Sequence, residues 1–76
     1  NPEAIQLITN AQTASFSLTN LPEQAEVIVI NSLGQTCRIQ RHKQNSFSIN
    51  EPAGIYYIQV RFNNQELKIL PYYKKD

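Results

Sequence analysis

The chain has 76 residues, with seven Lys or Arg, six Asp or Glu and a formal net charge of +1. This length allows one domain, and a domain so small buries only about 60% of the surface that its unfolded chain exposes. The low charge provides no strong field to attract a nucleic acid or an anionic membrane, so we expect no nucleic-acid partner. No apolar run approaches the ~18 residues of a membrane-spanning helix.

The sequence begins at Asn1-Pro2 without a methionine, and it contains no signal peptide. We therefore expect residues 1–76 to be a single domain cut from a longer secreted protein, with any targeting signal further upstream. Cys37 is the only cysteine, so no intrachain disulfide can form. Because Cys37 shares a face with Ile39, we predict a small core residue, and the alternative is a reactive thiol.

Apolar and polar residues alternate in short segments through the first two thirds of the chain, which is typical of half-buried strands. Turn residues separate these segments, and Gly34 is the expected position of positive φ in a short hairpin. The segment Val27–Ile30 is apolar on both faces, which favours a central strand or one covered by another surface. Residues 41–45 are predicted to form a polar loop. The five strands expected here are 5–9, 13–19, 25–31, 36–40 and 46–50.

A turn followed by the strongest strand of the chain occupies residues 51–62. Pro52 fixes its own φ and lacks an N–H, so it ends the preceding strand, and Gly54 can adopt positive φ. Aromatic and β-branched residues then predict a strand over 55–62. Tyr56 enters this strand just after the corner. We expect it to bury its ring and to hydrogen-bond its hydroxyl to nearby backbone, as in the tyrosine corner of immunoglobulin-like sandwiches.

Asn63-Asn64 is a two-residue hairpin signal, because Asn tolerates positive φ better than most residues. Gln65–Leu70 is the last expected strand, and Pro71 is expected to end it, leaving residues 71–76 as a tail. Seven short strands without helical periodicity predict an all-β, antiparallel β-sandwich. The side chains expected to point inward are Leu7, Phe16, Leu18, Val27, Val29, Cys37, Ile39, Phe47, Ile49, Tyr56, Ile58, Val60, Phe62, Leu67 and Ile69.

Residues for catalysis or metal binding are scarce. His42 lies between Arg41 and Lys43 in a polar segment, where the neighbouring positive charge makes it a poor base. The carboxylates are scattered over turns and strand ends, and no serine lies in a nucleophile elbow. One Cys and one His cannot form a closed metal site, and two isolated glycines cannot cradle a phosphate. We therefore expect no catalytic residues, no metal, no cofactor and no enzymatic activity.

Two groups of residues suggest contacts with other molecules. The cluster of Arg38, Arg41, His42 and Lys43 would suit an anionic glycan or lipid headgroup, although such clusters are more often solvated hairpin ends. Ile28 and Ile30 point away from the core if Val27 and Val29 point inward. Such a row of apolar groups indicates a contact face, either for a preceding domain or for a second copy of the chain.

Four motifs occur in order along nearly the whole chain. They are Asn1-Pro2, a strand over 27–32 that runs into Leu33-Gly34, the corner Pro52-Ala53-Gly54-Ile55-Tyr56, and the closing strand with Lys68-Ile69-Leu70. In this ordered set the chain resembles the type A C-terminal sorting domain of the Bacteroidetes type IX secretion system. Each motif alone is unspecific, and the order of all four carries the resemblance.

The resemblance implies a seven-stranded immunoglobulin-like sandwich and a role without catalysis. Such domains label exported cargo: the translocon recognises them, and a sortase usually removes them and attaches the cargo to lipopolysaccharide. The implied partners are the translocon, the sortase and the preceding cargo domain, and the implied route leads through the periplasm to the outer-membrane surface or outside the cell. The last strand would offer its open edge to a partner strand or to a second copy, with Lys68 as an orienting charge.

One departure from the family pattern concerns the end of the chain. Family members often finish within a few residues of the closing strand, whereas this chain continues through residues 71–76. That difference leaves open whether the domain is a cleaved label or a retained part of the machinery. The competing interpretation is an immunoglobulin- or fibronectin-like spacer or glycan-binding module of a surface protein. The only aromatic residues that would serve a glycan are Tyr57, Tyr72 and Tyr73.

Overall fold

The computed structural model describes residues 4–10 and 15–75, which form seven antiparallel strands. No helix in this part of the chain is long and apolar enough to cross a membrane. The expected turn at 10–12 and the first residues of the expected second strand fall largely outside the described residues. The strands are β1 (Gln6–Asn10), β2 (Ser15–Thr19), β3 (Glu26–Asn31), β4 (Ile39–Lys43), β5 (Ser46–Ile49), β6 (Gly54–Phe62) and β7 (Gln65–Lys74).

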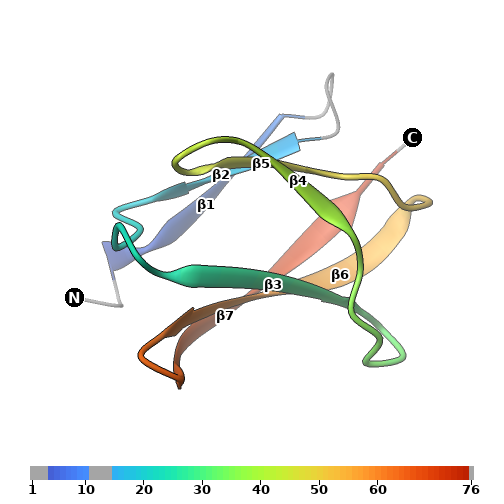
Figure 1. The fold of residues 1–76 in the computed structure, drawn as a ribbon. Coiled ribbons are helices and arrows are strands. Elements are labelled where there is room, and N and C mark those ends of the chain that lie inside the picture. Colours follow the sequence, from blue (N-terminus) through green and yellow to red (C-terminus); the bar gives the residue numbers. More distant parts are fainter. Residues whose placement is uncertain (1–3, 11–14, 76) are drawn as a thin grey trace.

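The strands form two antiparallel sheets, as predicted for an all-β chain (Figure 1). One sheet has the order β1-β2-β5-β4 and the other has the order β3-β6-β7. In the first sheet Phe16 lies opposite Phe47, and in the second Val29 lies opposite Ile58. All four of these side chains are buried, so the two sheets share one core between their inner faces.

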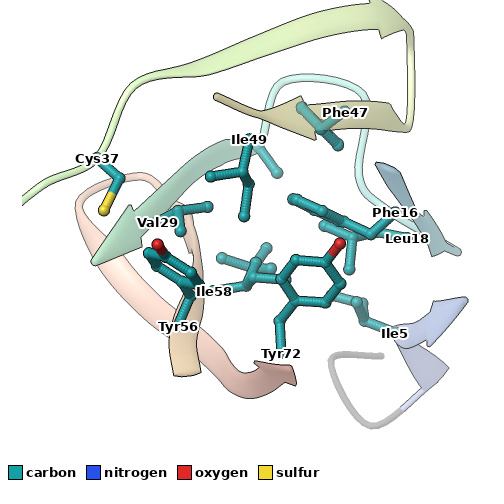
Figure 2. Close-up of a cluster of buried hydrophobic side chains, with 12 residues drawn as sticks. Ile5, Phe16, Leu18, Val29, Cys37, Phe47, Ile49, Tyr56, Ile58 and Tyr72 are labelled. Carbon is teal, nitrogen blue, oxygen red and sulfur yellow. The ribbon is translucent and has the colours of Figure 1, made fainter. Parts of the chain in front are cut away.

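The core joins aromatic rings and aliphatic side chains from both sheets. Phe16 stacks on Phe47 and meets Tyr72 in a tilted contact, with ring centroids 5.3 Å apart in both pairs. Figure 2 shows Tyr72 reaching from β7 toward these two phenylalanines. The buried residues are Ile5, Phe16, Leu18, Ala25, Val29, Cys37, Phe47, Ile49, Tyr56, Ile58, Val60 and Tyr72.

The prediction of a fourth strand over 36–40 was wrong, because this segment is divided between the two sheets. Residues 35–37 still pair with the end of β3: the N–H of Cys37 donates to the carbonyl of Val29 at 2.7 Å. The chain then crosses to the other sheet, where β4 covers Ile39–Lys43. Most of the expected polar loop at 41–45 is therefore strand. Arg41 pairs with Phe47, and only a two-residue turn remains before β5.

The prediction that Pro71 ends the last strand was also wrong. β7 continues to Lys74, and Pro71 lies opposite Tyr57 of β6. β7 is the outermost strand of its sheet, and an edge strand is one of the few strand positions where proline is tolerated. The expected tail is therefore structural as far as residue 74, and it supplies Tyr72 to the core.

The predicted inward set was wrong at Ile69, which is exposed. A register shift places Val60 opposite Lys68 but Arg61 opposite Glu66, so Leu67 is the extra residue of a β-bulge. Beyond the bulge Lys68, Leu70 and Tyr72 follow the inner side instead. Ile5, Ala25 and Tyr72 belong to the core although they were not predicted there. Of the two positions that the sequence left open for Val27–Ile30, the central one is excluded, because β3 is an edge strand.

Candidate functional site

Three of the four sequence motifs meet on the three-stranded sheet. The turn with Gly34 follows β3, the corner with Pro52 and Ala53 leads into β6, and Lys68-Ile69-Leu70 belongs to β7. Asn1 and Pro2 lie outside the described residues. The motifs are separated by up to about half of the chain, and only the pairing β3-β6-β7 brings them together. We therefore take this sheet, with its turns, as the candidate site.

The corner before β6 is held by the side chain of Tyr56. Its hydroxyl donates a hydrogen bond to the backbone carbonyl of Pro52 at 2.5 Å, which confirms the bond predicted from the sequence. Burial raises the pKa of the Tyr56 hydroxyl, and the nearby Cys37 and Glu51 add to this rise. The ammonium of Lys74, at the end of β7, donates to the carbonyl of Glu51. Both bonds tie the sheet to the corner residues.

The turn after β3 is a compact network around Asn31. The side-chain oxygen of Asn31 accepts hydrogen bonds from the backbone N–H groups of Leu33 and Gln35, both at 2.9 Å. Gly34 has the predicted positive φ, at 83°, and donates its N–H to the carbonyl of Asn31. The tip of this well-bonded turn carries Leu33, which is 81% exposed. An ordered turn thus presents an apolar side chain to solvent.

The side chain of Lys68 connects the two ends of the chain. Its ammonium donates to the carbonyl of Ile5 at 2.7 Å, across 63 positions of the sequence. Lys68 lies opposite the buried Val60, so it emerges on the inner side of the sheet and is partly buried. The family resemblance implied an orienting charge for a partner at this position. In the structure this charge holds the last strand against the segment that precedes β1.

The open edge of β7 has three features that natural sheets use to discourage strand addition. It contains the bulge at Leu67, the inward-directed cation of Lys68, and Pro71. Each of these features interrupts or discourages a regular ladder with a new strand. Pairing along this edge, which the sequence suggested for recognition or dimerisation, would therefore have to overcome all three.

The outer face of the same sheet carries apolar side chains on all three strands. Ile28 and Ile30 lie on it, as the alternation predicted, and both are half-buried. Ile28 lies opposite Gln59 and Ile30 opposite Tyr57, while Gln59 in turn lies opposite Ile69. The contact face proposed from two isoleucines is thus wider than the sequence indicated. Its extension over β7 was missed because the bulge reverses the alternation there.

Two members of the predicted basic cluster, Arg41 and His42, lie on opposite sides of β4, and Arg38 precedes that strand. The guanidinium of Arg41 lies 5.1 Å from the centroid of the Phe47 ring and donates two bonds to the carbonyl of Gln44, at 3.1 and 2.6 Å. His42 lies on the opposite side of the strand, with Nε2 2.8 Å from Oγ of Ser48. Arg41 therefore closes the hairpin between β4 and β5 with two of its N–H groups.

Side chains suited to chemistry are not gathered in the described residues. No group of three or more His, Cys, Asp or Glu is placed to hold a metal ion in this part of the chain. Cys37 is buried in the core, as predicted, with Sγ 3.7 Å from the carbonyl of Gln35. Burial raises the pKa of its thiol, and the charge of Glu51 raises it further. A buried thiol held in its protonated form is a poor nucleophile.

No protein-family model matches this chain, and no curated protein matches it either. The function of the chain therefore has to be argued from its own residues and geometry.

Proposed function

We propose that the chain is a C-terminal sorting domain of the type IX secretion kind, a folded label that directs attached cargo across the outer membrane. In this proposal a translocon recognises the domain, and a sortase, as is usual for such labels, removes it and attaches the cargo to lipopolysaccharide. The observation that carries the proposal is the gathering of three separate motifs on the sheet β3-β6-β7. The proposed route leads from the periplasm to the cell surface.

The strand order supports the immunoglobulin-like part of this proposal. An immunoglobulin constant-type domain has strands A, B, E and D in one sheet and C, F and G in the other. The orders β1-β2-β5-β4 and β3-β6-β7 correspond to these two sheets strand for strand. Tyr56 and its bond to the carbonyl of Pro52 occupy the place of the tyrosine corner, at the start of the sixth strand.

The contacts of the motif residues suggest how such a label would work. Gly34 permits a tight turn, Tyr56 holds a corner, and Lys68 joins the last strand to Ile5. These residues build the fold, and a partner would read the surface that the fold displays. In this interpretation the partner recognises the folded surface, and the ordered motifs are the residues that produce that fold.

The test is export of a reporter in a Bacteroidetes host. A periplasmic fluorescent protein is fused to residues 1–76 and expressed in the normal host and in a strain without the type IX translocon. We expect surface fluorescence only in the normal host, and none for the reporter without the domain. Simple truncation before Lys68 would be a poor control, because it removes Tyr72 from the core. Periplasmic retention in both strains, with the domain still resistant to protease, would overturn the proposal.

The second candidate is a spacer or glycan-binding module of a cell-surface protein. The observation that favours glycan binding is that Tyr57 and Tyr73 are both exposed on the outer face of one sheet. Exposed aromatic rings stack on sugar rings, whereas Tyr72 is buried and unavailable. Binding of a polysaccharide that is lost in Tyr73→Ala would support this candidate, and retention of binding in that variant would contradict it.

A further inference from the structure

Large exposed apolar side chains are concentrated on one side of the molecule. Among the residues that the structure describes, six large hydrophobic residues are exposed, and only Ile8 belongs to the four-stranded sheet. The other five lie on the three-stranded sheet or in the turn that follows β3. They are Leu33, Ile55, Tyr57, Ile69 and Tyr73.

These side chains form continuous rows across the sheet. Strand pairing places Ile28, Gln59 and Ile69 in one row, and Ile30, Tyr57 and Pro71 in the next. A third row joins Ile55 to Tyr73, which is 65% exposed. Leu33 follows at the same end, because its turn begins where Asn31 pairs with Tyr56. We name these residues the outer apolar face (Figure 1 shows the sheet).

We propose that the outer apolar face binds the same face of a second copy of the chain, so that two three-stranded sheets pack face to face about a two-fold axis. This inference goes beyond the proposed function and does not depend on it. Face-to-face packing of sheets about 10 Å apart is an ordinary arrangement for apolar sheet surfaces. A two-fold contact requires a patch that is complementary to itself.

The charges at the two ends of the outer apolar face have the complementarity that a two-fold contact needs. Arg61 lies opposite Glu26 on one side and Glu66 on the other, so this end carries one net negative charge. The opposite end carries Tyr73 and lies beside Lys75, which is exposed and directly follows β7. A two-fold axis that passes near Tyr57, between the two sheets and perpendicular to their strands, would place each acidic end against the basic end of the other copy.

The size of the face fits the low end of protein–protein interfaces, which suits a weak and reversible dimer. The three strands are 6, 9 and 10 residues long. At about 4.8 Å between strands and roughly 3.3 Å per residue, they form a surface on the order of 14 Å wide and 20–33 Å long. Its accessible area exceeds this projection, because exposed side chains such as Tyr73 project from it. A standard interface buries about 800 Å² on each partner, and the largest apolar patch of a typical monomer is about 300–600 Å².

The first experiment measures the oligomeric state of the chain by sedimentation equilibrium over a concentration range from micromolar to millimolar. We expect a reversible dimer. Tyr57→Lys and Ile69→Lys each place two charges in the centre of the proposed interface, and we expect at least about a tenfold weaker dimer. The matched control is Ile8→Lys, which adds the same charge at a site 57% exposed on the other sheet. It should leave the dimer unchanged.

Tyr57→Lys also separates the face from the edge of β7. Tyr57 lies in β6, the central strand, so a dimer formed through the β7 edge would tolerate this change. As a control, circular dichroism of each variant checks that it remains folded. A chain that stays monomeric up to millimolar concentration would overturn the proposal and leave the face to a different partner. A dimer that Ile8→Lys weakens as much as Tyr57→Lys does, or that Tyr57→Lys leaves intact, would overturn it equally.

Discussion

The outer faces of the two sheets differ far more than their inner faces do. On the four-stranded sheet, β2 and β5 turn outward only small hydroxyl-bearing residues, with Ser15 opposite Ser48 and Ser17 opposite Ser46. On the three-stranded sheet, the pairs on the outer face include Ile30 opposite Tyr57 and Ile55 opposite Tyr73. Both sheets alternate with the same period, so strand formation alone does not explain the difference.

The comparison separates residues that fold the domain from residues that remain available for contacts. Inner faces must be apolar in both sheets, because only their burial offsets the conformational entropy lost on folding. Outer faces need not be apolar, and small polar residues can stay hydrated there at little cost in free energy. The serine-rich face therefore fits a surface left in solvent, while the outer apolar face fits a surface that another molecule covers.

The largest effect is expected from Phe16→Ala, which tests whether the two sheets fold as one unit. The substitution removes a fully buried ring that stacks on Phe47 and contacts Tyr72 from the opposite sheet. Removal of such a ring costs about 3–5 kcal/mol, out of the roughly 4–11 kcal/mol available to a domain of this length.

Denaturant unfolding followed by circular dichroism and by tyrosine fluorescence measures this effect. Both signals should move together to lower denaturant. The neighbour Ser17→Ala, on the serine-rich face, should change stability by less than about 0.5 kcal/mol. Two separate transitions would show that the sheets unfold independently and do not share one core.

A smaller effect is expected from Lys68→Met, which breaks a link between the last strand and the other end of the chain. The substitution keeps the aliphatic stem and removes the ammonium that donates to the carbonyl of Ile5. A hydrogen bond from a charged group contributes about 1.5–3 kcal/mol when buried, and we expect about 1 kcal/mol here because Lys68 is only partly buried. Lys43→Met, at an exposed position of β4, is the control and should be neutral. Equal stability of the two variants would show that the bond from Lys68 to Ile5 does not stabilise the domain.

Tyr56→Phe should cost about 1 kcal/mol, because it removes a hydroxyl bonded to the carbonyl of Pro52 and preserves the ring. The control is Tyr57→Phe, which removes the same group from the exposed side of the adjacent residue. Thermal unfolding distinguishes them, with Tyr56→Phe lowering the melting temperature and Tyr57→Phe leaving it nearly unchanged. A neutral Tyr56→Phe would show that ring burial alone holds the corner.

The stability of the domain is expected to fall at alkaline pH, because three ionisable side chains are buried in the core. They are Cys37, Tyr56 and Tyr72. Burial, aided by the charge of Glu51, raises the pKa of the Cys37 thiol above its ordinary value of 9.0. The folded state therefore holds the thiol protonated. Its contribution is fully present below pH 9.0 and is lost as the pH rises from there through the folded pKa. Burial likewise raises the pKa values of Tyr56 and Tyr72, which extends the loss above pH 10.0.

Stability measured between pH 7 and 11 checks this expectation. Cys37→Ala should be less stable at neutral pH, because it leaves a small cavity, and it should lose less stability between pH 9 and 10. An unchanged slope in that interval would mean that Cys37 does not contribute to the alkaline loss.

Local conformational preferences determined much of the fold from the sequence alone. Period-two alternation located most strands, because each strand has one buried face. Asn63 and Asn64 both adopt positive φ, at 53° and 63°, as their hairpin requires. The bond of Tyr56 to Pro52 was also predictable, since both partners lie within four residues of each other. The breadth of the candidate site was not predictable, because it depends on strands far apart in the chain.

Tertiary structure decided the features that depend on a strand's neighbours. Pro71 is tolerated because β7 has no strand on its outer side, and no local signal reveals which strand is outermost. The bulge at Leu67 reverses the alternation, so Ile69 faces solvent and Lys68 meets Ile5. A sequence records which residues alternate, but the face on which each one ends depends on pairing between distant segments. That pairing brought three motifs and the apolar rows onto one sheet.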